Sequence, residues 1–157
     1  YLAGRGLKLV ALDRDTVAMV ALATWAMDSA SASVELRLAD VEAGPWPFGA
    51  AEFDGVVVTN YLHRPLFTRI IESLRPGGVL IYETFAQGNQ HYGKPSNPAY
   101  LLAPNELLER LLPALSVVAF EQGRISSPAA AVVQRICAVR TAVQTKDWQQ
   151  IPDANSG

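Results

Sequence analysis

Four polar side chains each end or follow a short apolar run of this 157-residue chain: Asp13, Asp40, Asn60 and Glu83. If the runs are parallel strands, their carboxyl ends share one edge of a sheet, which is where open α/β sheets bind ligands. A carboxylate there can accept hydrogen bonds from both hydroxyl groups of a ribose. The competing interpretation is an ordinary helix cap or turn. We expect Asp13 to bind such a ligand and Asp15 to cap a helix.

A second group of side chains could act on another reactant. His63 follows the apolar run 53–60, and histidine is a common general base near neutral pH. Tyr61, Tyr82 and Glu83 could line the pocket of that reactant, although Tyr82 also fits a core aromatic residue. No histidine or cysteine spacing is typical of a metal site, so we predict no metal ligands.

The apolar periodicity predicts the elements that hold these residues. Strands are expected at 9–12, 34–38, 53–60, 79–85, 115–121 and 132–141, and helices at 15–27, 65–74 and 105–112. Their order predicts an α/β fold: a Rossmann-like, doubly wound, mostly parallel sheet with a C-terminal antiparallel hairpin. We expect one domain over 1–142 and a polar tail over 143–157.

Two connections stand out in this pattern. The run from Leu74 to Phe85 contains Pro76, Gly77 and Gly78, and we expect one of the glycines to end the preceding helix in a left-handed conformation. The segment 86–104 is rich in Gly, Asn, Gln and Pro and is long for a simple connection. It suits substrate recognition or a lid, or else a surface loop held by prolines, and the sequence leaves its role open.

The amino-acid composition limits the kinds of molecule that the protein is expected to bind and the compartment in which it is expected to work. The net charge of −2 offers no general attraction to phosphate backbones, so nucleic acid is not an expected partner. Cys137 is the single cysteine, which excludes an internal disulfide and favours a reducing, cytoplasmic location. No apolar stretch is long enough to span a membrane.

Most of the chain resembles the class I S-adenosylmethionine (SAM) dependent methyltransferases. Residues 9–13 resemble the second strand of that family, residues 38–42 the segment after the third, residues 53–62 the fourth strand and its end, and residues 74–85 the entry to the fifth. Residues 88–102 resemble an insertion found in a small-molecule or tellurite-resistance-like branch. The resemblance implies SAM as the cofactor and methyl transfer to a small-molecule acceptor.

The resemblance also assigns roles to particular residues. It implies that Asp13, with Arg14 beside it, holds the SAM ribose, while Asp40 and the backbone amide of Val41 face the adenine. The matching positions beside the methionine part and the acceptor are Asn60, Tyr61 and Leu62. The candidates for catalysis are His63, Tyr82 and Glu83.

One part of the family pattern is absent. Its first strand and glycine-rich loop would precede Tyr1, so we expect either a longer native protein or an unusual pairing of strands. Without that strand two apolar edges are unpaired, which favours a homo-oligomer. Two alternatives therefore stay open: an NAD-binding Rossmann domain, and a non-catalytic, truncated domain that self-associates.

Overall fold

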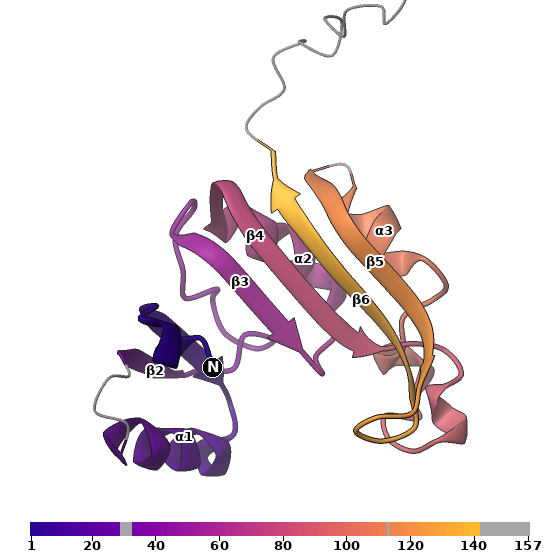
Figure 1. The fold of residues 1–157 in the computed structure, drawn as a ribbon, viewed down its shortest axis with the longest axis horizontal. Coiled ribbons are helices and arrows are strands. Elements are labelled where there is room, and N and C mark those ends of the chain that lie inside the picture. The colour runs from indigo at the N-terminus through magenta and orange to yellow at the C-terminus, as the bar shows by residue number, and fades with distance from the viewer. Residues whose placement is uncertain (29–32, 113, 142–157) are drawn as a thin grey trace, which may run out of the picture. The chain divides into compact units, whose positions relative to one another are not determined.

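The computed structural model describes residues 1–28, 33–112 and 114–141, so the predicted polar tail over 143–157 lies outside the described residues. The chain divides into two compact units, Tyr1–Pro47 and Phe48–Gly157. Each unit contains its own hydrogen-bonded sheet, and the two sheets carry different sets of the predicted site residues (Figure 1).

The first unit is a strand-helix-strand arrangement. A 3-10 turn, η1 (Ala3–Arg5), precedes strand β1 (Leu9–Asp13), helix α1 (Thr16–Asp28) and strand β2 (Val34–Leu38). β1 and β2 pair in parallel, from Leu9 opposite Val34 to Asp13 opposite Leu38. The predicted strands and helix are therefore confirmed, and both strands end at the same edge.

The second unit is a four-stranded sheet in the order β3-β4-β6-β5. Its strands are β3 (Phe53–Thr59), β4 (Leu74–Phe85), β5 (Leu115–Ile125) and β6 (Ala131–Arg140). β3 and β4 are parallel, whereas β6 is antiparallel to both β4 and β5. The mostly parallel α/β fold with a C-terminal antiparallel hairpin is thus confirmed.

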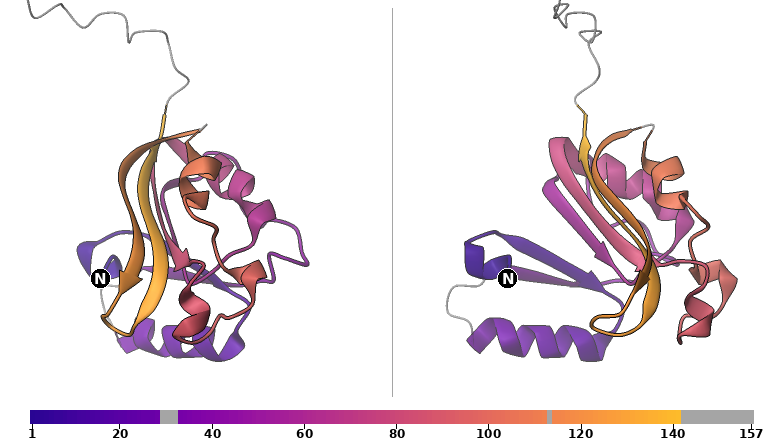
Figure 2. Two further views of the ribbon diagram at one scale, coloured as in Figure 1. Left: turned by 90° about the vertical axis from the view of Figure 1, so that its right-hand side faces the viewer. Right: turned by 45° about the vertical axis from the view of Figure 1, so that its right-hand side comes forward.

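Helices cover one face of this second sheet (Figure 2). They are α2 (Phe67–Ser73), which follows the 3-10 turn η2 (Arg64–Leu66), and α3 (Glu106–Leu111). On that face the side chains of Leu80, Tyr82 and Ile136 are almost fully buried. Ile81 and Val57 point to the other face and are about half exposed. The core of the unit therefore lies on the helical side of the sheet.

The connection between α2 and β4 differs from the prediction. The α-helix ends at Ser73, and Leu74 is already extended, so neither glycine ends the helix. Gly77 does have the left-handed φ of 81°, but it lies in an irregular stretch at the start of β4. There the pairing passes from Phe53 opposite Leu74 to Gly55 opposite Val79. The register favours this bulge because Leu74 is completely buried beside β3.

The predicted helix over 65–74 is also shorter than expected. Its first turn is 3-10, with Pro65 near the start, and the α-helical part covers only seven residues. Such 3-10 turns are frequent at the N-terminus of an α-helix, and proline is tolerated there because its missing N–H would have no partner in the helix.

The segment 86–104 is tied to the sheet at several points. It contains the 3-10 turns η3 (Asn89–His91) and η4 (Pro98–Tyr100), and an isolated bridge pairs Ala86 with Leu102. The buried side chain of Asn89 accepts a hydrogen bond from the Val132 amide and donates one to the carbonyl of Pro95. The segment is therefore packed into the second unit at both ends.

Candidate functional site

At the end of β1, Asp13 and Asp15 have different roles. Asp15 Oδ1 accepts hydrogen bonds from the amides of Val17 (2.8 Å) and Ala18 (3.2 Å), which confirms Asp15 as the cap of α1. Asp13 Oδ1 accepts the Asp15 amide at 2.9 Å. The other oxygen, Oδ2, has no hydrogen-bond partner among the described residues. Asp13 therefore forms the turn and keeps one carboxylate oxygen for a ligand.

At the end of β2, Asp40 lies close to Arg14. Asp40 Oδ2 is 3.4 Å from the Arg14 guanidinium, and both side chains are exposed. Asp40 Oδ1 accepts the amides of Glu42 and Ala43, and these bonds, with Arg14 nearby, hold the pKa of Asp40 below its ordinary value. The amide of Val41, between them, forms no hydrogen bond with any described residue. The parallel pairing of β1 and β2 thus gathers Asp13, Arg14, Asp40 and Val41 at one edge.

In the second unit, Asn60, Tyr61, Leu62 and His63 follow β3. Asn60 has a left-handed φ of 53°, and its amide donates to the carbonyl of Glu83 on β4. Leu62 is buried, and His63 is half-buried at the start of η2. The left-handed conformation of Asn60 therefore turns the chain at the carboxyl end of β3, and the hydrogen bond from the Asn60 amide to Glu83 holds this turn against β4.

Tyr82 lies beneath this turn. Its hydroxyl donates to the carbonyl of Tyr61 at 2.8 Å, and its ring stacks on Phe67 with centroids 5.4 Å apart. Burial raises the pKa of the Tyr82 hydroxyl far above its ordinary value of 10.0. In this arrangement Tyr82 holds the backbone at Tyr61 and keeps its proton.

Glu83 points to the opposite face of the sheet. Its carboxylate forms an ion pair with Arg135 on β6 (2.5 Å), which also pairs with Glu121 on β5 (3.3 Å). The three residues are directly opposite one another in register. Because neighbouring residues of a strand alternate between faces, the structure does not bring Glu83 and the Tyr82 hydroxyl together.

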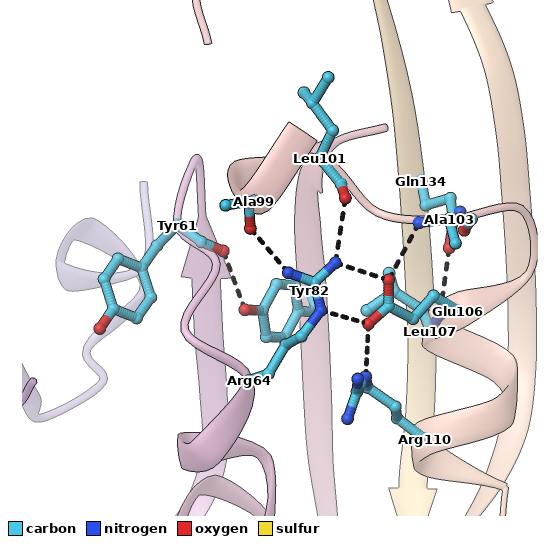
Figure 3. A network of polar contacts seen from close by, with 10 residues as sticks. All are labelled: Tyr61, Arg64, Tyr82, Ala99, Leu101, Ala103, Glu106, Leu107, Arg110 and Gln134. Carbon is cyan, nitrogen blue, oxygen red and sulfur yellow. Dashed lines mark hydrogen bonds and ion pairs between the residues drawn. The ribbon is translucent and has the colours of Figure 1, made fainter. Parts of the chain in front are cut away.

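A further polar network lies beside Tyr82 and was not predicted from the sequence (Figure 3). The Arg64 guanidinium donates to both oxygens of Glu106, at 2.7 and 2.9 Å, and to the carbonyls of Ala99 (2.6 Å) and Leu101 (3.0 Å). Glu106 also accepts hydrogen bonds from Arg110 and from the amide of Ala103. The i, i+4 spacing of Glu106 and Arg110 is a visible helical signal, but nothing local connects Arg64 to Glu106.

The residues at the β1–β2 edge suit a nucleoside. Asp13 Oδ2 can accept hydrogen bonds from ribose hydroxyls, and the Val41 amide can donate to a ring nitrogen. Both groups lack another partner among the described residues, so a ligand would compete with no existing bond. Among the parts of the chain that the structure describes, no group of three or more His, Cys, Asp or Glu side chains could hold a metal ion.

Several solved structures share this fold. A SAM-dependent methyltransferase from Methanosarcina mazei superposes with a TM-score of 0.69 and 17% identity, over 89% of this chain and 85% of that one. TehB from Haemophilus influenzae superposes with a TM-score of 0.69 and 15% identity, over 90% of this chain and 52% of that one. The 1,6-didemethyltoxoflavin-N1-methyltransferase of Burkholderia thailandensis, solved with bound 1,6-didemethyltoxoflavin and S-adenosylhomocysteine, superposes with a TM-score of 0.64 and 21% identity, over 88% of this chain and 64% of that one.

Sequence comparison adds no closer relative. No protein-family model matches the chain, and no curated protein matches its sequence. At these identities the structural likeness establishes a Rossmann-like fold shared with SAM-dependent methyltransferases, and the fold alone. Within the described residues, the helices are all too short or too polar to cross a membrane.

Proposed function

We propose that this protein is a SAM-dependent methyltransferase that acts on a small-molecule acceptor. The observation that carries the proposal is the edge where β1 and β2 end: Asp13 of β1 keeps a free carboxylate oxygen, and the amide of Val41, which follows β2, forms no hydrogen bond with the described residues. Bound SAM would supply an electrophilic methyl group on a sulfonium.

The residues of this chain would mainly bind and orient. Asp13 would accept hydrogen bonds from the ribose hydroxyls, with Arg14 beside it, and Asp40 and Val41 would face the adenine. Asn60, Tyr61 and Leu62 would contact the methionine part and the acceptor. Positioning of this kind supplies much of the rate of a displacement reaction, so a dedicated base is optional. His63, Tyr82 and Glu83 remain candidates for catalysis.

The substitution Asp13→Asn separates the ligand role of Asp13 from its turn role. The Asn oxygen can keep the bond to the Asp15 amide, while its NH₂ group takes the place of Oδ2 and cannot accept from ribose. We expect isothermal titration calorimetry to show S-adenosylhomocysteine bound by the native protein and bound about 10- to 100-fold more weakly by the variant. The matched control is Asp54→Asn, which removes an exposed carboxylate paired with Arg75.

Two alternatives are tested in the same preparation. An acidic side chain after such a strand also binds the ribose of NAD, so a fluorescence titration with NADH tests a nicotinamide-binding domain. Tight NADH binding without S-adenosylhomocysteine binding would replace the proposal. The non-catalytic alternative is motivated by β1 and β3, each of which has one strand partner among the described residues. Binding of neither ligand, with a homo-oligomer in light scattering, would favour it.

A further inference from the structure

A small cavity opens between the 86–104 segment and the β5–β6 hairpin. Its volume is about 190 Å³, and its lining includes Ala86, Gln87, Leu102, Gln122, Val133 and Gln134. A buried cavity of about 150 Å³ in another protein holds benzene, so this one has room for a single substituted ring. Aliphatic side chains form much of the wall, which favours a ligand with an apolar body.

The polar side chains of the wall can donate hydrogen bonds. Gln134 has both ends bonded, to the Leu107 amide and the Ala103 carbonyl. Gln122 accepts the Asn105 amide through Oε1, so its NH₂ group is the end left for a ligand. Gln87 forms no side-chain hydrogen bond with the described residues. Two side-chain NH₂ groups beside an apolar wall suit a ligand that presents acceptor oxygens.

Charge around the cavity has one sign. The segments 84–105 and 122–134 contain no Asp or Glu, although the chain has 15, and they contain the basic residues Lys94 and Arg124. Gln122 and Arg124 lie two residues apart on β5 and therefore share a face, toward the cavity. Arg124 lies over the ring of Tyr92, 5.3 Å from its centroid, and forms no ion pair within the described parts of the chain. Along β5, Arg124 directly follows Gly123, which lines the cavity.

The nearby acids do not cancel this charge. Glu83 and Glu121 are on the opposite face of the sheet, where both pair with Arg135. Glu106 lies on the cavity side, but its carboxylate is paired with Arg64 and Arg110. A negatively charged ligand in the cavity would therefore meet the NH₂ groups of Gln87 and Gln122, and the guanidinium of Arg124 belongs to the residue that follows the lining residue Gly123.

From the wall, the donors and the charge we infer that this cavity binds a small anion with an apolar body, such as an aromatic carboxylate. The binding of such an anion does not rest on the proposed function, because it needs neither SAM nor Asp13.

The test compares two probes of nearly equal shape, benzoate and benzamide, on the native protein. Each is titrated while backbone amide signals are followed by NMR. We expect benzoate to bind at least about fivefold more tightly than benzamide, as one charge-assisted contact near a surface provides. The shifts should be confined to Ala86, Gln87, Leu102, Gln122 and Gly123. Equal affinities, shifts elsewhere, or no binding of benzoate would overturn the inference.

Two variants locate the charge and the donor. In Arg124→Met, benzoate and benzamide should bind with about equal affinity. Arg69→Met, which removes an exposed arginine on α2, should keep the preference for benzoate that the native protein has. Gln87→Leu should weaken the binding of benzoate. It should leave the thermal stability unchanged, because the side chain of Gln87 forms no hydrogen bond with the described residues. An unchanged preference in Arg124→Met would contradict the site. If S-adenosylhomocysteine fails to bind while benzoate binds as expected, the methyltransferase proposal fails and the anion site stands.

Discussion

Arg64 and Glu106, 42 residues apart in the chain, form a two-point ion pair in which each carboxylate oxygen accepts one N–H group of the guanidinium. The same guanidinium bonds to the carbonyls of Ala99 and Leu101. The pair therefore joins the start of η2, the end of the 86–104 segment and α3. Figure 3 shows the pair beside Tyr82, whose hydroxyl donates to the carbonyl of Tyr61.

Removing Arg64 should destabilise the protein. Arg64→Met leaves Glu106, whose side chain is 8% exposed, with Arg110 and the Ala103 amide as its remaining partners. Breaking a fully buried pair costs about 3–5 kcal/mol, and the side chain of Arg64 is 33% exposed, so we expect a loss of about 2–3 kcal/mol. Urea unfolding measures it. Arg69→Met serves as the control, with an expected change below about 0.5 kcal/mol.

Acid should weaken the same cluster. Burial by itself raises the pKa of Glu106, but hydrogen bonds from Arg64, Ala103 and Arg110 outweigh burial and lower the pKa from 4.5 to about 2. Because the pKa is lower in the folded state, the stability from Glu106 is complete above about pH 4.5 and is lost as the pH falls toward 2. Unfolding measured from pH 6 to about 2 should show a shallower acid slope in Glu106→Gln than in the native chain. Equal slopes would contradict the assignment.

The bulge at the start of β4 should not tolerate a larger residue at Gly78. A Cβ there would lie 2.9 Å from the carbonyl oxygen of Arg75 and 3.2 Å from that of Phe53, and both are backbone atoms. Gly78→Ala should therefore cost about 1–3 kcal/mol in thermal or urea unfolding. Gly49→Ala is the matched control, since its new Cβ would meet only the flexible Glu52 side chain, at 3.5 Å. Similar losses in both variants would show that the bulge is not what restricts Gly78.

The Tyr82 hydroxyl should contribute to stability at neutral pH and lose that contribution in alkali. Tyr82→Phe leaves the Tyr61 carbonyl without its donor, which costs about 1 kcal/mol. Since burial raises the pKa of Tyr82, its contribution is complete below about pH 10 and is lost as the pH rises further. Between about pH 9 and 12, the free energy of unfolding should therefore fall less steeply with pH in the variant than in the native chain. A native chain with the same alkaline slope as Tyr82→Phe would exclude this role.

Local sequence patterns were enough to predict most of the helices and strands. The alternation of β2, the apolar run of β3 and the Asp15 cap of α1 each depend on residues within one strand or one turn, so the sequence alone predicts them. The same holds for the placement of Asp13, Asp40 and Asn60 after strands. Their assignment to a cofactor stays a prediction.

Only the tertiary structure determined which distant residues pair and which face of the sheet each side chain occupies. Leu74 is fully buried beside Phe53, and this contact ends α2 at Ser73 in spite of the glycines that follow. Register places Arg135 between Glu83 and Glu121, while Tyr82 points the other way. Arg64 and Glu106 meet because η2 and α3 pack on the same face of one sheet. Such pairings depend on register and packing between distant segments, which the period and caps of each segment alone do not specify.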